Sequence, residues 1–278
     1  MSEAPRILDA RIEAERLRTR YASDPRQQSF RVLVTGESGT GKTHLFRTAR
    51  RPVHVDSFDP GGTLVLRDLI ERGHIVADTI YETEDRTDPT MFREWARNFE
   101  HRSKNKYFES FGTYCLDSST MWAEAIMNWV LKEAQITGKA PRWAHDYVPQ
   151  KVEIQNWMRR ILTLPCDVVV TGHLESIYEA VILHRGTKEE ETVQVLTGYK
   201  YMTTGKGAII IPLLFDEQWT TFAEEKGMGT EYRMITAKWK LYRARTRIGR
   251  GVFETFEKPD IKVLLKKAGW PTNDKEKL

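Results

Sequence analysis

Residues 36–43 have the types and the spacing of a loop that binds phosphate groups. They read Gly-Glu-Ser-Gly-Thr-Gly-Lys-Thr and match the pattern G-x-x-x-x-G-K-[ST] at every defined position. Glycines let the backbone wrap a phosphate with its N–H groups, while the lysine neutralises phosphate oxygens and the final threonine gives a hydroxyl to magnesium. We therefore expect ATP and Mg²⁺ to bind through Gly36, Ser38, Gly39, Thr40, Gly41, Lys42, Thr43 and His44.

A magnesium ion in such a loop needs a second protein ligand, which is normally an acid at the end of a neighbouring apolar strand. Asp117 follows the apolar run 113–116 and fits this place. Thr43 and Asp117 are therefore the expected metal ligands. The alternative for Asp117 is a helix N-cap, because the periodic helix pattern of residues 119–133 begins just after it.

Hydrolysis of ATP also requires a group that orients or deprotonates the attacking water. Asp56 and Asp59 follow a short strand expected at 53–55, and both are candidates, although either could instead form the next turn. His173 follows another apolar run, 168–171. A polar group at that strand end would face the γ-phosphate and pass its state to the loop that follows. The alternative for His173 is an ordinary surface histidine.

The elements that would hold these residues alternate between strands and helices. Apolar runs with β-branched residues predict strands at 30–34, 53–55, 75–77, 113–116 and 168–171. Apolar residues at helical spacing predict helices at 42–50, 64–71, 89–101, 119–133 and 150–162. This alternation is typical of a parallel sheet with right-handed crossovers. The expected fold class is therefore α/β, a P-loop NTPase core with a mainly parallel central sheet flanked by helices.

The chain changes character after residue 173. Residues 174–207 are polar and predict an irregular segment, whereas 218–222 and 232–242 predict strands of a small antiparallel C-terminal addition. Helices are expected near both ends, at 7–22 and 260–268. We expect three parts, namely an N-terminal helix and possible oligomerisation arm at 1–29, an ATPase core at 30–258, and a C-terminal helix with a polar tail at 259–278.

Composition indicates an ordinary globular chain. Its 278 residues are enough for one large domain. No apolar run approaches the roughly 18 residues of a membrane span, and residues 1–21 lack the apolar segment of a secretory signal. Cys115 and Cys166 lie in apolar stretches without metal-ligand spacing. We therefore expect buried thiols, a cytoplasmic location and no membrane partner.

The net charge of +4 makes the chain only mildly basic, but cations gather in one segment. Between Tyr232 and Phe253 there is no acid and there are seven cations, Arg233, Lys238, Lys240, Arg243, Arg245, Arg247 and Arg250. Such a local field suits a polyphosphate, either a nucleotide or a nucleic acid. The alternative is a solvated strand face.

With these residues in place, the chain resembles a RecA-like P-loop ATPase of the single-domain phage type, a group that includes phage single-strand annealing and recombination ATPases. The matching features begin with the loop 36–43, the strand end at Asp117 and the Thr-Gly-His strand end at 171–173. The segment 214–217, the basic run that contains Arg245 and Arg247, and the ending 264–269 also match.

The resemblance implies an assembled enzyme that contacts DNA. In RecA-like proteins the loop after the His173 position binds single-stranded DNA. Here that loop would be at about 174–205, with phosphate contacts from Arg185, Lys188, Lys200 and Lys206. Cations near the end of the core reach the ATP of a neighbouring subunit. Arg245 and Arg247 are therefore further catalytic candidates, with Lys238 and Lys240 behind them. The homo-oligomer would be a filament or a ring, in the host cytoplasm if the chain is phage-encoded.

Three functions compete. The first is an oligomeric ATPase that hydrolyses ATP to ADP and phosphate, binds single-stranded DNA and acts in recombination or annealing. The second is a phage ATPase that acts on protein partners as a loader, remodelling factor or assembly motor, which the acids Glu189, Glu190 and Glu191 of the proposed DNA loop favour. The third is a small-molecule kinase, which lacks an identifiable substrate pocket in the sequence.

Overall fold

The structure is a computed structural model that describes residues 9–24, 27, 29–183, 191–203, 207–227, 229–249 and 251–278. Six strands form the parallel part of its central sheet: β1 (Arg31–Gly36), β2 (Val53–Ser57), β3 (Ile75–Asp78), β4 (Thr113–Asp117), β5 (Asp167–Leu183) and β7 (Glu217–Lys226). Antiparallel partners are β6 (Glu191–Tyr201), β8 (Gly229–Ile235), β9 (Arg245–Thr246) and β10 (Phe256–Glu257). Neighbouring strands follow the order β10-β8-β7-β1-β5-β4-β2-β3.

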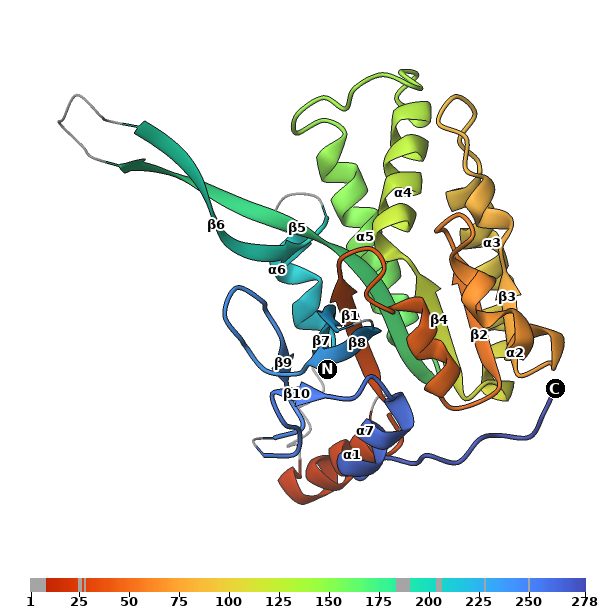
Figure 1. The fold of residues 1–278 in the computed structure, drawn as a ribbon. Coiled ribbons are helices and arrows are strands. Elements are labelled where there is room, and N and C mark those ends of the chain that lie inside the picture. Colours follow the sequence, from red (N-terminus) through yellow and green to blue (C-terminus); the bar gives the residue numbers. More distant parts are fainter. Residues whose placement is uncertain are drawn as a thin grey trace.

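Helices lie on both sides of this sheet (Figure 1). The α-helices are α1 (Ala10–Ala22), α2 (Arg67–Glu71), α3 (Met91–Lys104), α4 (Ser119–Glu133), α5 (Tyr147–Ile161), α6 (Gly207–Ile210) and α7 (Ile261–Lys267). The 3₁₀ helices are η2 (Thr43–Thr48), η3 (Gly62–Leu66), η4 (Ile80–Thr83), η5 (Tyr107–Ser110) and η6 (Pro212–Leu214). The predicted α/β class, with a mainly parallel sheet and an antiparallel C-terminal addition, is confirmed.

Two apolar layers form because side chains alternate along each strand. In β1, Leu33 packs into the layer that contains the buried faces of α3, α4 and α5. Its neighbours Val32 and Val34 pack into the opposite layer, with residues from η2, α2 and α7. All six residues of β1 are buried. The strand that ends at the phosphate loop is therefore held rigidly from both faces.

The segment after the phosphate loop differs from the prediction. The helix expected at 42–50 is the 3₁₀ helix η2, which ends at Thr48. Since β2 begins at Val53, the chain must return along β1 within a few residues. A 3₁₀ helix rises about 2.0 Å per residue, against about 1.5 Å for an α-helix, so it covers this distance with fewer residues.

Strand β7 also differs from the prediction, which assigned residues 218–222 to the antiparallel addition. β7 pairs in parallel with β1, from Val32↔Glu217 to Gly36↔Thr221, and antiparallel with β8. Its Trp219 is fully buried and lies 5.2 Å from the ring of Phe30. The parallel sheet therefore extends one strand beyond β1, and only the strands after β7 belong to the addition.

A long hairpin replaces the irregular segment predicted at 174–207. Strand β5 pairs with β4 up to Val170 and with β1 up to His173, then leaves the central sheet and pairs with β6 from Leu174↔Tyr201 to Leu183↔Glu191. Figure 1 shows this ribbon reaching away from the rest of the molecule. Most described residues of its outer half are exposed, so neither face lies on a core.

No helix in the described part of the chain is long and apolar enough to cross a membrane.

Candidate functional site

The predicted phosphate loop lies at the carboxyl end of β1 and is tied to β7. Thr40 Oγ1 donates to Glu37 O at 2.8 Å and lies 2.9 Å from Thr221 Oγ1. Gly36 sits under this contact, where an added Cβ would come within 2.4 Å of Thr221 Oγ1. Gly39 and Gly41 have φ values of 77° and 85°, which other residues rarely adopt. The glycine positions of the motif thus follow from backbone geometry.

Lys42 is buried under the loop that it serves. Its ammonium donates to Gly36 O at 3.0 Å and to Glu37 O at 2.7 Å. Burial lowers its pKa, against the opposing effect of Asp117, Asp59 and Glu37. The ammonium is therefore held at the floor of the loop, where a phosphate oxygen could replace the two carbonyl oxygens.

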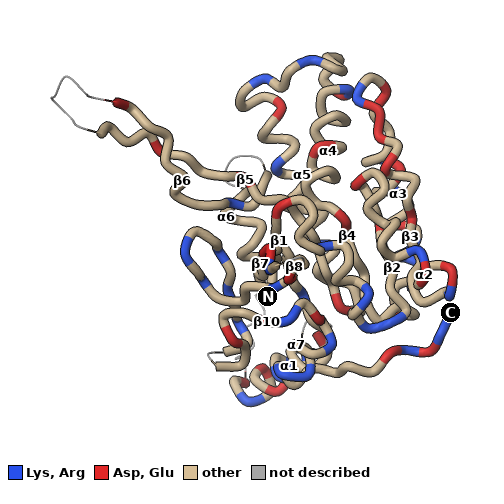
Figure 2. Tube along the Cα trace, viewed as in Figure 1, with Lys and Arg blue, Asp and Glu red and all other residues tan. Residues whose placement is uncertain are grey.

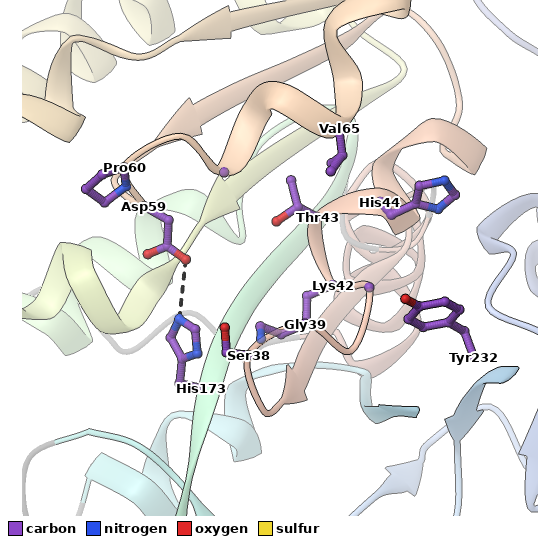
Figure 3. A pocket seen from close by; sticks show the side chains of 12 residues that line it. Ser38, Gly39, Lys42, Thr43, His44, Asp59, Pro60, Val65, His173 and Tyr232 are labelled. Atoms are coloured by element: carbon purple, nitrogen blue, oxygen red, sulfur yellow. Dashed lines mark hydrogen bonds and ion pairs between the residues drawn. The ribbon is translucent and has the colours of Figure 1, made fainter. Parts of the chain in front are cut away.

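A cavity of about 470 Å³ opens above the loop, a size that suits a small-molecule ligand. Figure 3 shows its lining, which comes from four parts of the chain: Ser38, Gly39, Gly41, Lys42, Thr43 and His44 from the loop and η2; Asp59, Pro60, Gly62 and Val65 after β2; His173 from β5; and Tyr232 from β8. Asp59 and His173 lie at one end, and His44 and Tyr232 lie at the other.

The two predicted metal ligands are in contact with each other. Thr43 Oγ1 donates to Asp117 Oδ2 at 2.7 Å, while Thr171 Oγ1 donates to Asp117 Oδ1 at 2.5 Å. Burial raises the pKa of Asp117. Mg²⁺ takes one or two protein oxygens and completes its shell with water and phosphate. A hydroxyl and a carboxylate side by side fit that ion, and magnesium would lower the pKa that burial raises.

Asp59 and His173 form a pair at the end of the cavity. His173 Nε2 lies 3.3 Å from Asp59 Oδ2, and Ser118 Oγ donates to Asp59 Oδ1 at 2.7 Å. Burial alone would raise the pKa of Asp59, but the hydrogen bonds from His173 and Ser118 outweigh it and lower the pKa. The carboxylate is therefore ionised at neutral pH and held by two donors.

A family of proteins described as AAA domain matches residues 28–248, most of the chain. The chain belongs to this family. It is therefore a P-loop ATPase of the AAA type, for which binding of a nucleotide with magnesium is a general property. No curated protein sequence matches it significantly.

Two solved structures resemble this AAA domain at low identity. One is a KaiC-like protein from the hyperthermophilic archaeon Pyrococcus horikoshii OT3, with a TM-score of 0.39 and 12% identity over 79% of this chain and 82% of the other. The second is the flagellar accessory protein FlaH from Methanocaldococcus jannaschii, with a TM-score of 0.39 and 10% identity over 82% of this chain and 83% of the other.

Asp56, the other candidate for positioning water, does not line the cavity of the AAA domain. Strand β2 continues to Ser57, two residues beyond its predicted end, so Asp56 lies inside the sheet and is fully buried. Its carboxylate accepts from Trp95 at 2.8 Å and Tyr114 at 2.7 Å, and it pairs with Arg102 at 3.1 Å. The strand end was misplaced in the sequence, and of the two candidate acids Asp59 is the one that lines the cavity.

The predicted trans cations lie away from the phosphate loop. Arg245 donates to Pro212 O at 2.5 Å and Phe215 O at 3.2 Å, and burial lowers its pKa. Arg247 is exposed, and its backbone N–H donates to Asp216 O, beside the start of β7. That start is the edge of the sheet opposite the loop, because β7 is parallel to β1. Neither arginine therefore reaches the nucleotide pocket of its own chain.

Of the four cations expected to contact DNA after His173, the structure describes Lys200. Its ammonium pairs with Glu175 at 3.2 Å across the hairpin. The other three, Arg185, Lys188 and Lys206, lie outside the described residues, as do Glu189 and Glu190.

Several pocket residues were missed in the sequence. Pro60 and Gly62 belong to the turn 59–62 that begins at Asp59, so including the whole turn in the expected site would have found them. Ser118 does not line the cavity itself but holds Asp59 there, and its position next to Asp117 was the available signal. Tyr232 had no local signal, because it reaches the pocket through the pairing of β8 with β7.

Proposed function

We propose that this AAA domain hydrolyses ATP, assembles into oligomers and binds single-stranded DNA, as in recombination or strand annealing. The observation that carries the DNA part is the segment 236–244 between β8 and β9, which we call the basic loop. It presents Lys238, Lys240 and Arg243 to solvent without any acid. In Figure 2, Lys and Arg positions lie along a loop that projects beside the hairpin.

Aromatic rings accompany the cations of the basic loop. The ring of Tyr242 stacks on Tyr199 of the hairpin with centroids 4.6 Å apart, and the Lys240 ammonium lies 4.4 Å from the centre of Trp239. Surfaces that bind single-stranded nucleic acid usually combine cations, which contact the phosphate backbone, with aromatic rings on which bases stack. This combination supports the basic loop, rather than the outer hairpin, as the DNA contact.

The pocket supplies the groups that hydrolysis requires. The ionised Asp59 would orient the attacking water. Lys42 would neutralise the phosphoryl oxygens while the bond to the leaving β-phosphate oxygen breaks. Bound magnesium, held by Thr43 and Asp117, would supply further charge neutralisation. Each group is within the same cavity or directly beside it.

His173 would connect the nucleotide to the DNA surface. It pairs with Gly36 in the register of β1 and β5, and it contacts Asp59. Immediately after it, β5 becomes the hairpin, whose base touches the basic loop through the bond from Tyr199 N to Leu241 O at 3.1 Å. A shift of His173 on loss of the γ-phosphate would therefore pass along β5 to its partner β6, and from Tyr199 of β6 to the basic loop.

Binding of a fluorescent single-stranded oligonucleotide, titrated against salt with and without ATP, tests the DNA proposal. The double variant Lys238→Ala, Lys240→Ala should bind the oligonucleotide about 10-fold or more weakly. The slope of log K against log salt concentration should also be smaller, by about 0.7 per lost phosphate contact. The control is Lys104→Ala, Lys139→Ala, which removes equal charge from two exposed positions elsewhere. Absence of binding by the unmodified protein at low salt would refute the proposal.

A second candidate is an ATPase that acts on protein partners. The hairpin favours it, because its described residues after His173 carry three acids, Glu175, Glu179 and Glu191, against the single cation Lys200. They also expose apolar side chains, among them Tyr178 at 58% and Ile182 at 45%. ATP turnover that ignores DNA at every concentration would favour this candidate.

Assembly would complete the active site with a cation from a neighbouring copy, and Arg247 is the exposed candidate. Helix α1 buries none of its described residues, as an arm that packs on a neighbour would. Arg247→Ala should retain nucleotide binding and lose turnover. Mixing it with Lys42→Ala should restore part of the turnover, because some mixed sites combine an intact loop with an intact arginine. A mixture as inactive as its components would contradict a shared site.

A further inference from the structure

The direction of the nucleotide follows from the two ends of the pocket. Asp59 and His173 lie at the end where the γ-phosphate must be for a water to attack it. The loop residues that bind phosphates occupy the middle. The nucleoside must therefore extend toward the opposite end, which Figure 3 shows to be formed by His44 and Tyr232.

Tyr232 is fixed at this end by the strand that carries it. Side chains alternate along β8, so Tyr232 points to the same face as Met234. Met234 is fully buried in the apolar layer that also contains Leu45 and Phe46 of η2. Met234 therefore anchors β8 in the same apolar layer as the segment that follows the phosphate loop. Tyr232 lines the cavity beside Gly41.

The ring of Tyr232 lies against the loop and is also open to the cavity. An added Cβ on Gly41 would meet its Cδ1 at 3.4 Å, which is ordinary contact. The side chain is nevertheless 47% exposed. A large ring that is anchored, lines a cavity and has an uncovered surface is suited to contact another flat ring.

We propose that Tyr232 stacks on the nucleobase and is the base-binding residue of this site, with a purine nucleoside triphosphate as its ligand. This inference rests on the proposed binding of ATP and names the part of the chain that holds the end of the nucleotide away from the phosphates. Strand β8 thereby belongs to the nucleotide site, although it lies outside every phosphate-binding motif.

Comparison of two ligands tests the assignment, because inorganic tripolyphosphate has the charge of ATP's phosphates but no base. Dissociation constants of both ligands with Mg²⁺ would be measured by calorimetry. Tyr232→Ala should raise the dissociation constant of ATP about 10-fold, as expected for the loss of one stacking contact, and leave that of tripolyphosphate unchanged. Tyr232→Phe, which keeps the ring, should bind ATP like the unmodified protein. The control Tyr178→Ala removes an exposed ring from the hairpin and should change neither ligand.

Different failures have different meanings. Equal ATP affinity in Tyr232→Ala and the unmodified protein would overturn the base assignment alone. An equal loss of affinity for both ligands in Tyr232→Ala would also overturn it, since the loop would then carry the effect. So would a loss of affinity for ATP in Tyr232→Phe, since the hydroxyl would then carry it. If the unmodified protein binds neither ligand, the proposed ATP binding itself fails.

Discussion

Gly36→Ala tests how tightly the phosphate loop is clamped to β7. The new methyl would lie 2.4 Å from Thr221 Oγ1, 2.5 Å from Thr40 Oγ1 and 2.8 Å from Thr221 O. The last is a backbone atom, so a change of rotamer cannot relieve the clash. Overpacking typically costs about 1–3 kcal/mol. Lower entropy of the unfolded chain offsets about 0.4–1 kcal/mol. We expect a net loss of about 1–2 kcal/mol of unfolding free energy, together with weaker ATP binding.

Urea unfolding followed by circular dichroism measures this loss. For a slope near 3 kcal/mol per molar urea, the midpoint should fall by about 0.5 M. The matched control is Gly198→Ala in β6, where the nearest atoms would be at 3.8 Å and φ is ordinary. It should leave the midpoint unchanged or slightly higher. If the urea midpoint of Gly36→Ala is at or above that of Gly198→Ala, the close packing of the phosphate loop against β7 is refuted.

Further predictions concern the lysine and the buried acid. Lys42→Ala should lower phosphate release by about 100-fold or more, because a preorganised charge on the transferring group is lost, while circular dichroism stays unchanged. Arg102→Met should cost about 3 kcal/mol in urea unfolding, because it leaves the fully buried Asp56 without its arginine. Burial raises the pKa of Asp56, but His54 and Arg102 outweigh it and lower the pKa below its ordinary 3.8. The stability from Asp56 is therefore complete above pH 3.8 and lost as pH falls through the lower folded pKa, and in Arg102→Met the loss should begin at higher pH.

The phosphate loop and Asp117 were predictable because their signals are local. The motif at 36–43 fixes residue types at fixed spacing, and the apolar run before Asp117 indicates a buried strand whichever strands it pairs with. The amphipathic helix α4 was found for the same reason, since Trp122, Ile126 and Val130 recur at helical spacing and are all buried.

The hairpin was missed because both faces of its outer half meet solvent, so no alternation of apolar and polar residues marks it. Its β-branched residues, such as Val181, Ile182 and Val193, were the available signal. The choice between Asp56 and Asp59 depended on where β2 ends, a boundary that short apolar runs do not fix. Tyr232 and the parallel pairing of β7 depend on contacts between residues far apart in the sequence.

The central claim is that the pocket above residues 36–43 hydrolyses ATP in an assembled form of the protein. Phosphate release from ATP and Mg²⁺, measured over a wide range of protein concentrations with and without a single-stranded oligonucleotide, tests it most directly. We expect phosphate release that rises faster than linearly with protein concentration and is stimulated by the oligonucleotide. Absence of phosphate release at every concentration of the unmodified protein, both with and without the oligonucleotide, would contradict this claim.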